Sequence, residues 1–153
     1  MATFTKTVLL TGLFAATADL VSAFISVFLK TGKFSEKMFN YIAGGALGLD
    51  TALKGGTPIA LLGLFFHYFI ALSFTLFFFL LLPHAKFLFC NKYLVGMLYA
   101  VFVNLVMERL VLPLTPLPRG PFSLTHAYID WVVLGVLFGI PIVMNAYKYY
   151  GVE

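Results

Sequence analysis

Four long runs of apolar residues, separated by short polar segments, account for most of the chain. They cover residues 8–29, 58–82, 94–112 and 124–147. About 20 mostly apolar residues are needed to cross the hydrocarbon core of a bilayer, and each run is close to that length or above it. Backbone groups in lipid must be hydrogen-bonded within their own segment, so each run is expected to be an α-helix. The pattern predicts an all-α integral membrane bundle of four transmembrane helices, forming a single domain over residues 1–153.

Prolines stand where these helices are expected to begin, end or bend. Pro58 opens the second run, where its missing N–H costs nothing, and Pro83 and Pro113 follow the ends of the second and third runs. Pro141 lies inside the fourth run, where it removes a backbone hydrogen bond and predicts a kink.

The segment between the first two runs is too polar at its start to be a fifth crossing. Ser35 can cap a helix over residues 36–53, in which apolar side chains recur at helical spacing. We expect this short helix to lie in the membrane interface or to be partly re-entrant. Gly44, Gly45 and Gly48 weaken an isolated helix but allow close contact with another backbone.

An even number of crossings places both termini on the same side of the membrane. The cations on that side are Lys6, Lys86, Lys92 and Lys148, and those on the other side are Lys30, Lys33, Lys37, Lys54 and Arg119. Because the two sets nearly balance, the positive-inside rule does not decide the orientation. We expect cytoplasmic termini because that arrangement is the commoner one.

The composition agrees with a lipid environment. The chain is 61% hydrophobic and 10% charged, against about 45–50% and about 25% in soluble domains, so water is not a suitable solvent for it. The net charge of +4 comes from cations scattered singly between the apolar runs, and the absence of a basic stripe argues against a nucleic-acid partner. Cys90 is the only cysteine, so no disulfide or thiolate metal cluster can form within the chain.

Three polar residues are expected at one depth near the middle of the membrane: Asp19, His67 and Asn104. Asp19 lies on a stripe of small residues, spaced three or four apart, that runs from Gly12 to Ser26. An ionisable group at this depth is costly to insert and by default functional. Asp19 and His67 could therefore relay a proton or hold a cation. Alternatively, Asp19 could be a packing element with His67 as its hydrogen-bonded partner.

A second polar layer is predicted near the membrane surface opposite the termini. Its members end the third helix, occupy the following connection or begin the fourth helix, and they are Glu108, Arg109, Arg119, His126 and Asp130. Carboxylate and imidazole groups can hold a divalent metal, but no ligand spacing such as H-E-x-x-H is present. Ion pairing of the acidic residues with the arginines is the simpler interpretation. We therefore predict no metal site, and no haem, because the three histidines lie at different depths.

The fourth run carries two further signals. Gly135 and Gly139 form a small-xxx-small pair, which we interpret as packing within the chain, with a dimer interface as the alternative. Aromatic residues near its ends are typical of interfacial belts, and these are Tyr128, Trp131, Tyr147, Tyr149 and Tyr150.

Five short motifs carry a resemblance to a known group of proteins. They are Thr17 to Asp19, Tyr41 to Gly45, Leu62 to Leu64 with His67, Val111 to Leu114, and Gly139 to Pro141. In their order along the chain they resemble uncharacterised small four-helix proteins of the bacterial inner membrane that are loosely YagU-like. The resemblance implies a four-helix architecture and the bacterial inner (plasma) membrane, and it implies no activity.

Three functions fit these residues. The first, and the one we expect, is a non-catalytic component or accessory subunit of a membrane assembly. The second is a transporter or channel for protons, cations or a small solute that uses Asp19 and His67, and it implies a homo-oligomer because four helices rarely enclose a pathway alone. The third is a membrane-embedded enzyme or lipid-binding protein. The sequence contains no P-loop, Rossmann or G-x-S-x-G pattern, so no cofactor is expected and an enzyme is not favoured. The expected partners are the lipid bilayer, further copies of the chain or a larger membrane complex.

Overall fold

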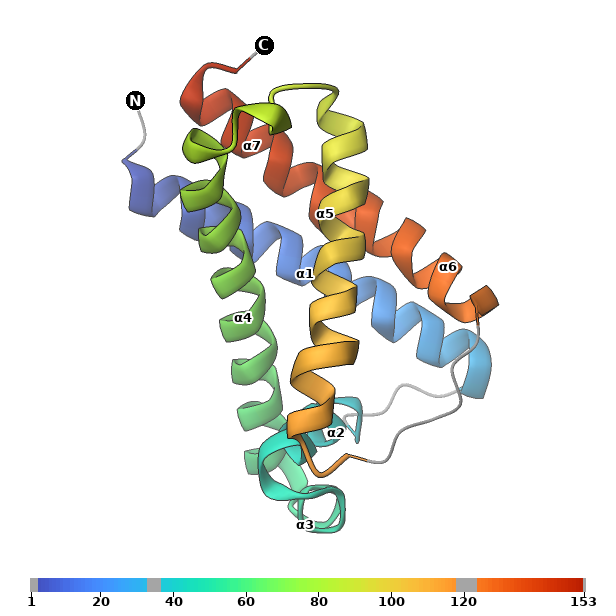
Figure 1. Cartoon of the computed structure of the whole chain (residues 1–153). Coiled ribbons are helices and arrows are strands. Elements are labelled where there is room, and N and C mark those ends of the chain that lie inside the picture. The colour runs from blue at the N-terminus through green and yellow to red at the C-terminus, as the bar shows by residue number, and fades with distance from the viewer. Residues whose placement is uncertain (1–2, 33–36, 118–123, 153) are drawn as a thin grey trace.

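A computed structural model describes residues 3–32, 37–117 and 124–152 of the chain (Figure 1). Within these ranges the structure consists of helices joined by short turns, and it contains no strand. Four helical stretches are long and apolar enough to cross a membrane. The predicted all-α bundle with four membrane-length helices is therefore confirmed.

Each of the four stretches contains one of the predicted runs. The first is α1 (Phe4–Thr31) and the second is α4 (Gly56–Leu81). Two 3-10 turns, η1 (Leu82–His84) and η2 (Lys86–Leu88), connect α4 to the third stretch. The third and fourth stretches are each built from three consecutive pieces. The third stretch consists of α5 (Lys92–Val106), the π-helical turn η3 (Met107–Val111) and the 3-10 turn η4 (Leu112–Leu114). The fourth consists of α6 (Leu124–Leu134), the π-helical turn η5 (Gly135–Gly139) and α7 (Ile140–Tyr150).

The four stretches form a bundle with three closely packed seams and one open seam. α4 packs on α1, α1 packs on η5 and α7, and those two segments pack on α5. By contrast, α4 and α5, both of which are fully described, make almost no backbone contact with each other. Figure 1 shows α1 and the α6–α7 stretch crossing α4 and α5 obliquely, with both ends of the chain at one end of the bundle.

Glycines allow the backbones at the α5–η5 seam to touch. A Cβ atom at Gly139 would collide with the carbonyl oxygen of Gly96, and one at Gly96 would lie 2.7 Å from the Cα of Ile140. Gly135 faces the side chain of Met97 on α5. The Gly135 and Gly139 pair is thus buried against α5, which confirms packing within the chain.

A π-helical turn takes up the distortion predicted at Pro141. Proline has no N–H to donate to the carbonyl four residues earlier. The turn η5 ends two residues before this proline, so the helix widens where its hydrogen-bond ladder is interrupted. The other π-helical turn, η3, likewise ends two residues before Pro113.

The segment predicted as one helix over residues 36–53 forms two helices, α2 (Lys37–Leu47) and α3 (Leu49–Lys54). Gly48 separates them with a φ of 81°, a value that other residues rarely adopt. The expected cap, Ser35, lies outside the described residues. The position of the segment relative to the membrane surface stays a prediction.

The α2 helix is fastened to α3 and α4 by a buried amide and a glycine contact. The Asn40 side chain donates to the carbonyl oxygens of Ala52 at 2.8 Å and Gly56 at 3.2 Å. A Cβ atom at Gly63 of α4 would collide with the carbonyl group of Phe39. The close backbone approach expected of this segment therefore depends mainly on a glycine of α4.

Two of the tyrosines expected in the interfacial belts bridge elements at the end of the bundle that holds both termini. Tyr147 is 3% exposed, and its hydroxyl donates to the carbonyl of Leu88. The Tyr150 hydroxyl donates to the carbonyl of Phe79 at 2.9 Å. Their hydroxyls satisfy backbone carbonyls where α4 ends and the connection to α5 follows, and their place in an interfacial belt stays a prediction.

Replacing Gly139 by alanine should destabilise the fold by about 1–3 kcal/mol, the usual cost of overpacking, because the new methyl group meets the Gly96 carbonyl. Gly45→Ala is the matched control, since its Cβ would lie 3.5 Å from Thr115, an ordinary contact. The unfolding midpoint in mixed micelles of SDS and dodecyl maltoside measures both changes. Equal midpoints for the two variants would show that the α5–η5 seam is not closely packed.

Candidate functional site

The seam between α1 and α4 carries two polar cross-links at one level of the bundle. Ala16 of α1 is fully buried, which lets α4 side chains reach the α1 backbone. The Nε2 atom of His67 donates to the Ala16 carbonyl oxygen at 3.0 Å. The hydroxyls of Tyr68 and Thr17 lie 2.8 Å apart. Because Thr17 donates its single proton to the Leu13 carbonyl, Tyr68 is the donor to Thr17.

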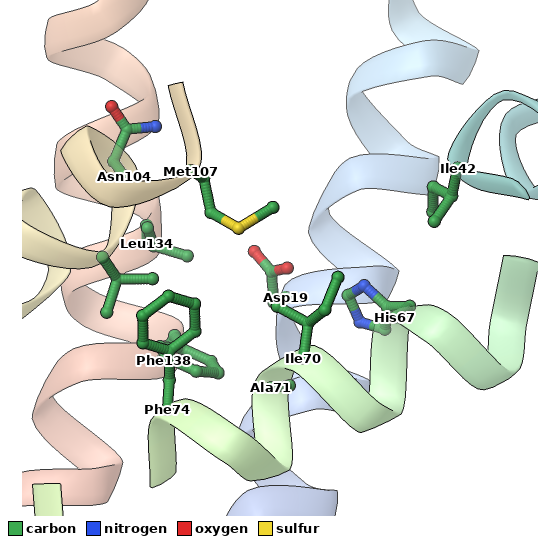
Figure 2. A pocket seen from close by; sticks show the side chains of 11 residues that line it. Asp19, Ile42, His67, Ile70, Ala71, Phe74, Asn104, Met107, Leu134 and Phe138 are labelled. Carbon is green, nitrogen blue, oxygen red and sulfur yellow. The ribbon is translucent and has the colours of Figure 1, made fainter. Parts of the chain in front are cut away.

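A cavity of about 190 Å³ adjoins this seam. Its polar lining is Asp19, His67 and Asn104, the three residues expected at one depth from the sequence. The rest of the wall is apolar and includes Met107 of η3 and Phe138 of η5. Figure 2 draws Asp19 between His67 and Asn104, with Met107 reaching toward the carboxylate. The structure therefore brings these three polar side chains, which come from three membrane-length stretches, to one space.

The Asp19 carboxylate points into the cavity (Figure 2) and accepts no hydrogen bond from the residues that the structure describes. Ser22, one turn along α1, donates to the backbone carbonyl of Asp19 at 2.7 Å and not to its carboxylate. The carboxylate interacts electrostatically with the His67 ring and with Asp130 of α6. Asp19 thus combines an acidic group with open space in front of it and a second carboxylate within electrostatic range.

His67 is oriented by the α1 backbone and not by Asp19. In a neutral ring, a proton on Nε2 for the bond to Ala16 leaves Nδ1 as an acceptor. The ring lies edge-on to that of Tyr68, with centroids 5.6 Å apart. The described side chains of His67 and Asp19 are not hydrogen-bonded to each other. The packing interpretation, in which His67 is the hydrogen-bonded partner of Asp19, therefore does not describe this pair.

Asn104 is held by a residue that the sequence pattern assigned to an interfacial belt. The Nε1 atom of Trp131 donates to the Oδ1 atom of Asn104 at 2.7 Å and links α6 to α5. Trp131 is half-buried, and its place in an interfacial belt stays a prediction. No spacing rule could reveal the bond, because the two residues are 27 positions apart on different helices.

The second predicted layer is described only in part. Glu108 and Arg109 lie on η3, and Asp130 is exposed on α6. The side chain of His126 and the whole of Arg119 lie outside the described part of the chain. Where side chains are described, no three His, Cys, Asp or Glu residues are placed to share a metal ion. The charge of Asp130 acts on Asp19 of the first layer, with the effect of repulsion between two carboxylates.

No protein-family model, curated protein or solved structure matches this chain. The resemblance to YagU-like proteins therefore stays an expectation. What the protein does has to be argued from the cavity and the groups around it.

Replacing Asp19 by leucine should leave the free energy of unfolding unchanged or raise it by about 1 kcal/mol, because an acidic group without a partner is exchanged for an apolar one. Asn40→Leu is the contrasting variant. It should lower stability by about 1–3 kcal/mol, because two buried carbonyls lose their donor. Unfolding in the same mixed micelles compares the two. If Asp19→Leu costs as much as Asn40→Leu, the Asp19 carboxylate is a structural clamp.

Proposed function

We propose that this protein is a small membrane carrier that binds a proton or a cation at Asp19. The supporting observation is the Asp19 carboxylate, which faces a cavity of about 190 Å³ without a hydrogen bond from the described residues. A charged side chain at mid-bilayer depth is costly and is kept where it faces a partner or a water-filled space. Because no described residue donates to it, the carboxylate is able to take up a proton or a cation.

Two neighbouring groups suit this role. Asp130 adds a second carboxylate within electrostatic range, and a bound positive charge relieves the repulsion between the two. His67 offers Nδ1 as a proton acceptor at the wall of the cavity. The cavity has room for several waters at about 30 Å³ each, so a proton can pass between His67 and Asp19 through water.

The bonds between the helices favour a carrier over a non-catalytic component. A purely structural role requires Asp19 to fasten helices together. The cross-links that do so are His67 to Ala16 and Trp131 to Asn104, and both leave the Asp19 carboxylate out. Among the three polar residues that line the cavity, His67 and Asn104 thus make bonds between helices, and Asp19 does not.

The proposed location is the bacterial inner membrane, with cytoplasmic termini and with the carrier acting as a homo-oligomer. Both chain ends lie at one end of the bundle, as an even number of crossings requires (Figure 1). A second copy would complete a pathway that four helices cannot enclose alone.

Liposomes that contain the protein and the pH dye pyranine test the carrier function. After a pH step, or with Na⁺ or tetramethylammonium on one side, protons should cross faster than in protein-free liposomes. Asp19→Asn should reduce the rate to that of the protein-free leak, because the amide cannot take up the proton or balance a cation.

Asp50→Asn is the matched control for this assay, since Asp50 is an exposed carboxylate on α3 outside the cavity. It should keep the wild-type rate. The carrier function is excluded if no gradient produces protein-dependent proton movement, or if Asp19→Asn transports as fast as the wild type.

A further inference from the structure

An apolar groove of about 440 Å³ runs along the open seam between α4 and α5. Its walls are side chains of α4 from Phe69 to Phe77 and side chains of α5 and η3 from Phe102 to Val111. The one hydroxyl in the lining, that of Ser73, donates to the Phe69 carbonyl at 2.7 Å. The groove therefore fits a hydrocarbon chain and offers it no polar partner.

The groove adjoins the Asp19 cavity. Ile70, Phe74 and Met107 line both spaces. Figure 2 shows these three side chains around Asp19. Rotation of these three side chains would let a molecule in the groove extend a polar end to the carboxylate. The two adjoining spaces are apolar on the groove side and acidic on the Asp19 side.

Side chains alone close the seam between the groove and the end of the bundle that holds the termini. The Tyr99 hydroxyl donates to the Phe74 carbonyl at 2.6 Å, and the rings of Phe77 and Phe102 stack with centroids 6.0 Å apart. Because α4 and α5 lack close backbone contact, side-chain rotation is enough to widen the seam. A ligand can thus reach the cavity sideways from the lipid.

The charge of the cavity selects the headgroup. Asp19 attracts a positive group and repels the phosphate of an ordinary phospholipid; the exposed Asp130 adds to its negative field and the His67 ring opposes it. Phe74 and Phe138 line the cavity, and aromatic ring faces bind ammonium groups favourably. A hydrocarbon chain with an anionic headgroup is therefore disfavoured at the inner end of the site.

We propose that the ligand is an amphiphilic cation, with its hydrocarbon tail in the α4–α5 groove and its ammonium group against Asp19. This proposal rests on the carrier function and names the class of substrate. It accounts for the groove beside the cavity, which a carrier of inorganic cations does not need.

The only tryptophan of the chain reports on this site. Trp131 donates to Asn104, which lines the cavity, so a ligand beside Asn104 should change the Trp131 emission. We expect decyltrimethylammonium to produce a saturable change in liposomes that contain the protein. Tetramethylammonium, the same head without a tail, should bind at least about tenfold more weakly after correction for lipid partitioning. Decanol, a tail without a charge, should give no saturable change.

Variants separate the head site from the groove. Asp19→Asn should weaken binding of both cations by at least about tenfold, which is the loss of a single charge-assisted contact. Ser73→Phe fills the groove, and it should weaken decyltrimethylammonium by about tenfold while leaving tetramethylammonium unchanged. Leu80→Phe, at an exposed position of α4 outside the groove, is the matched control and should alter neither.

The outcomes distinguish the two proposals. If both cations bind with equal affinity through Asp19, or if Ser73→Phe leaves decyltrimethylammonium binding unchanged, the tailed ligand is rejected and the carrier function stands. If decanol binds saturably, and with the same affinity in the wild type and in Asp19→Asn, the groove holds any hydrocarbon chain. That result also overturns this proposal. If no cation binds and the liposomes show no Asp19-dependent proton movement, both proposals fail.

Discussion

Contact between the α5 and η5 backbones at Gly96 and Gly139 shows the packing constraint that shapes this bundle. Helices in lipid gain little by burying apolar side chains, because the lipid tails are equally apolar, so small residues that let backbones approach must hold them together. At the α1–α4 seam, Gly12 makes room for side chains of α4, since its Cβ would lie 2.6 Å from the side chain of Leu72. The facing sides of α4 and α5 carry aromatic rings instead, which keep their backbones apart. Tight seams at glycine and an open seam at the aromatic residues thus follow from one physical rule.

The packing at these seams determines where the polar side chains lie. Ala16 brings α1 and α4 so close that His67 bonds to the α1 backbone, which leaves Asp19, three residues further along, without that partner. Asp19 faces the space left where α4 and α5 separate. An acidic group in this position is costly, because its burial is offset only by the charge interaction with the His67 ring and by no hydrogen bond from the described residues. A bound proton or cation would offset that cost. The proposed function is thus a chemical consequence of the space between the helices.

Depth and helical face could be predicted from the sequence, whereas contacts between distant helices could not. The four spans follow from the length of the apolar runs, and counting along them places Asp19, His67 and Asn104 at one level. The bond from Trp131 to Asn104 and the approach of Asp130 to Asp19 depend on oblique crossings and on two π-helical turns, which shift the helical face. Hydropathy carries no information on crossing angles. The sequence did not predict the break between α2 and α3, because a glycine such as Gly48 is compatible both with a closely packed helix and with a helix end.

The density inside the cavity, determined by crystallography in a lipid mesophase, tests most directly whether Asp19 faces a ligand site. A ligand site predicts non-protein density, from water, an ion or an elongated amphiphile, within hydrogen-bond distance of the Asp19 carboxylate. His67 should remain bonded to the Ala16 carbonyl in the same map. A map in which a protein donor, from this chain or a second copy, bonds the carboxylate while side chains fill the cavity would contradict the carrier and support a structural role for Asp19.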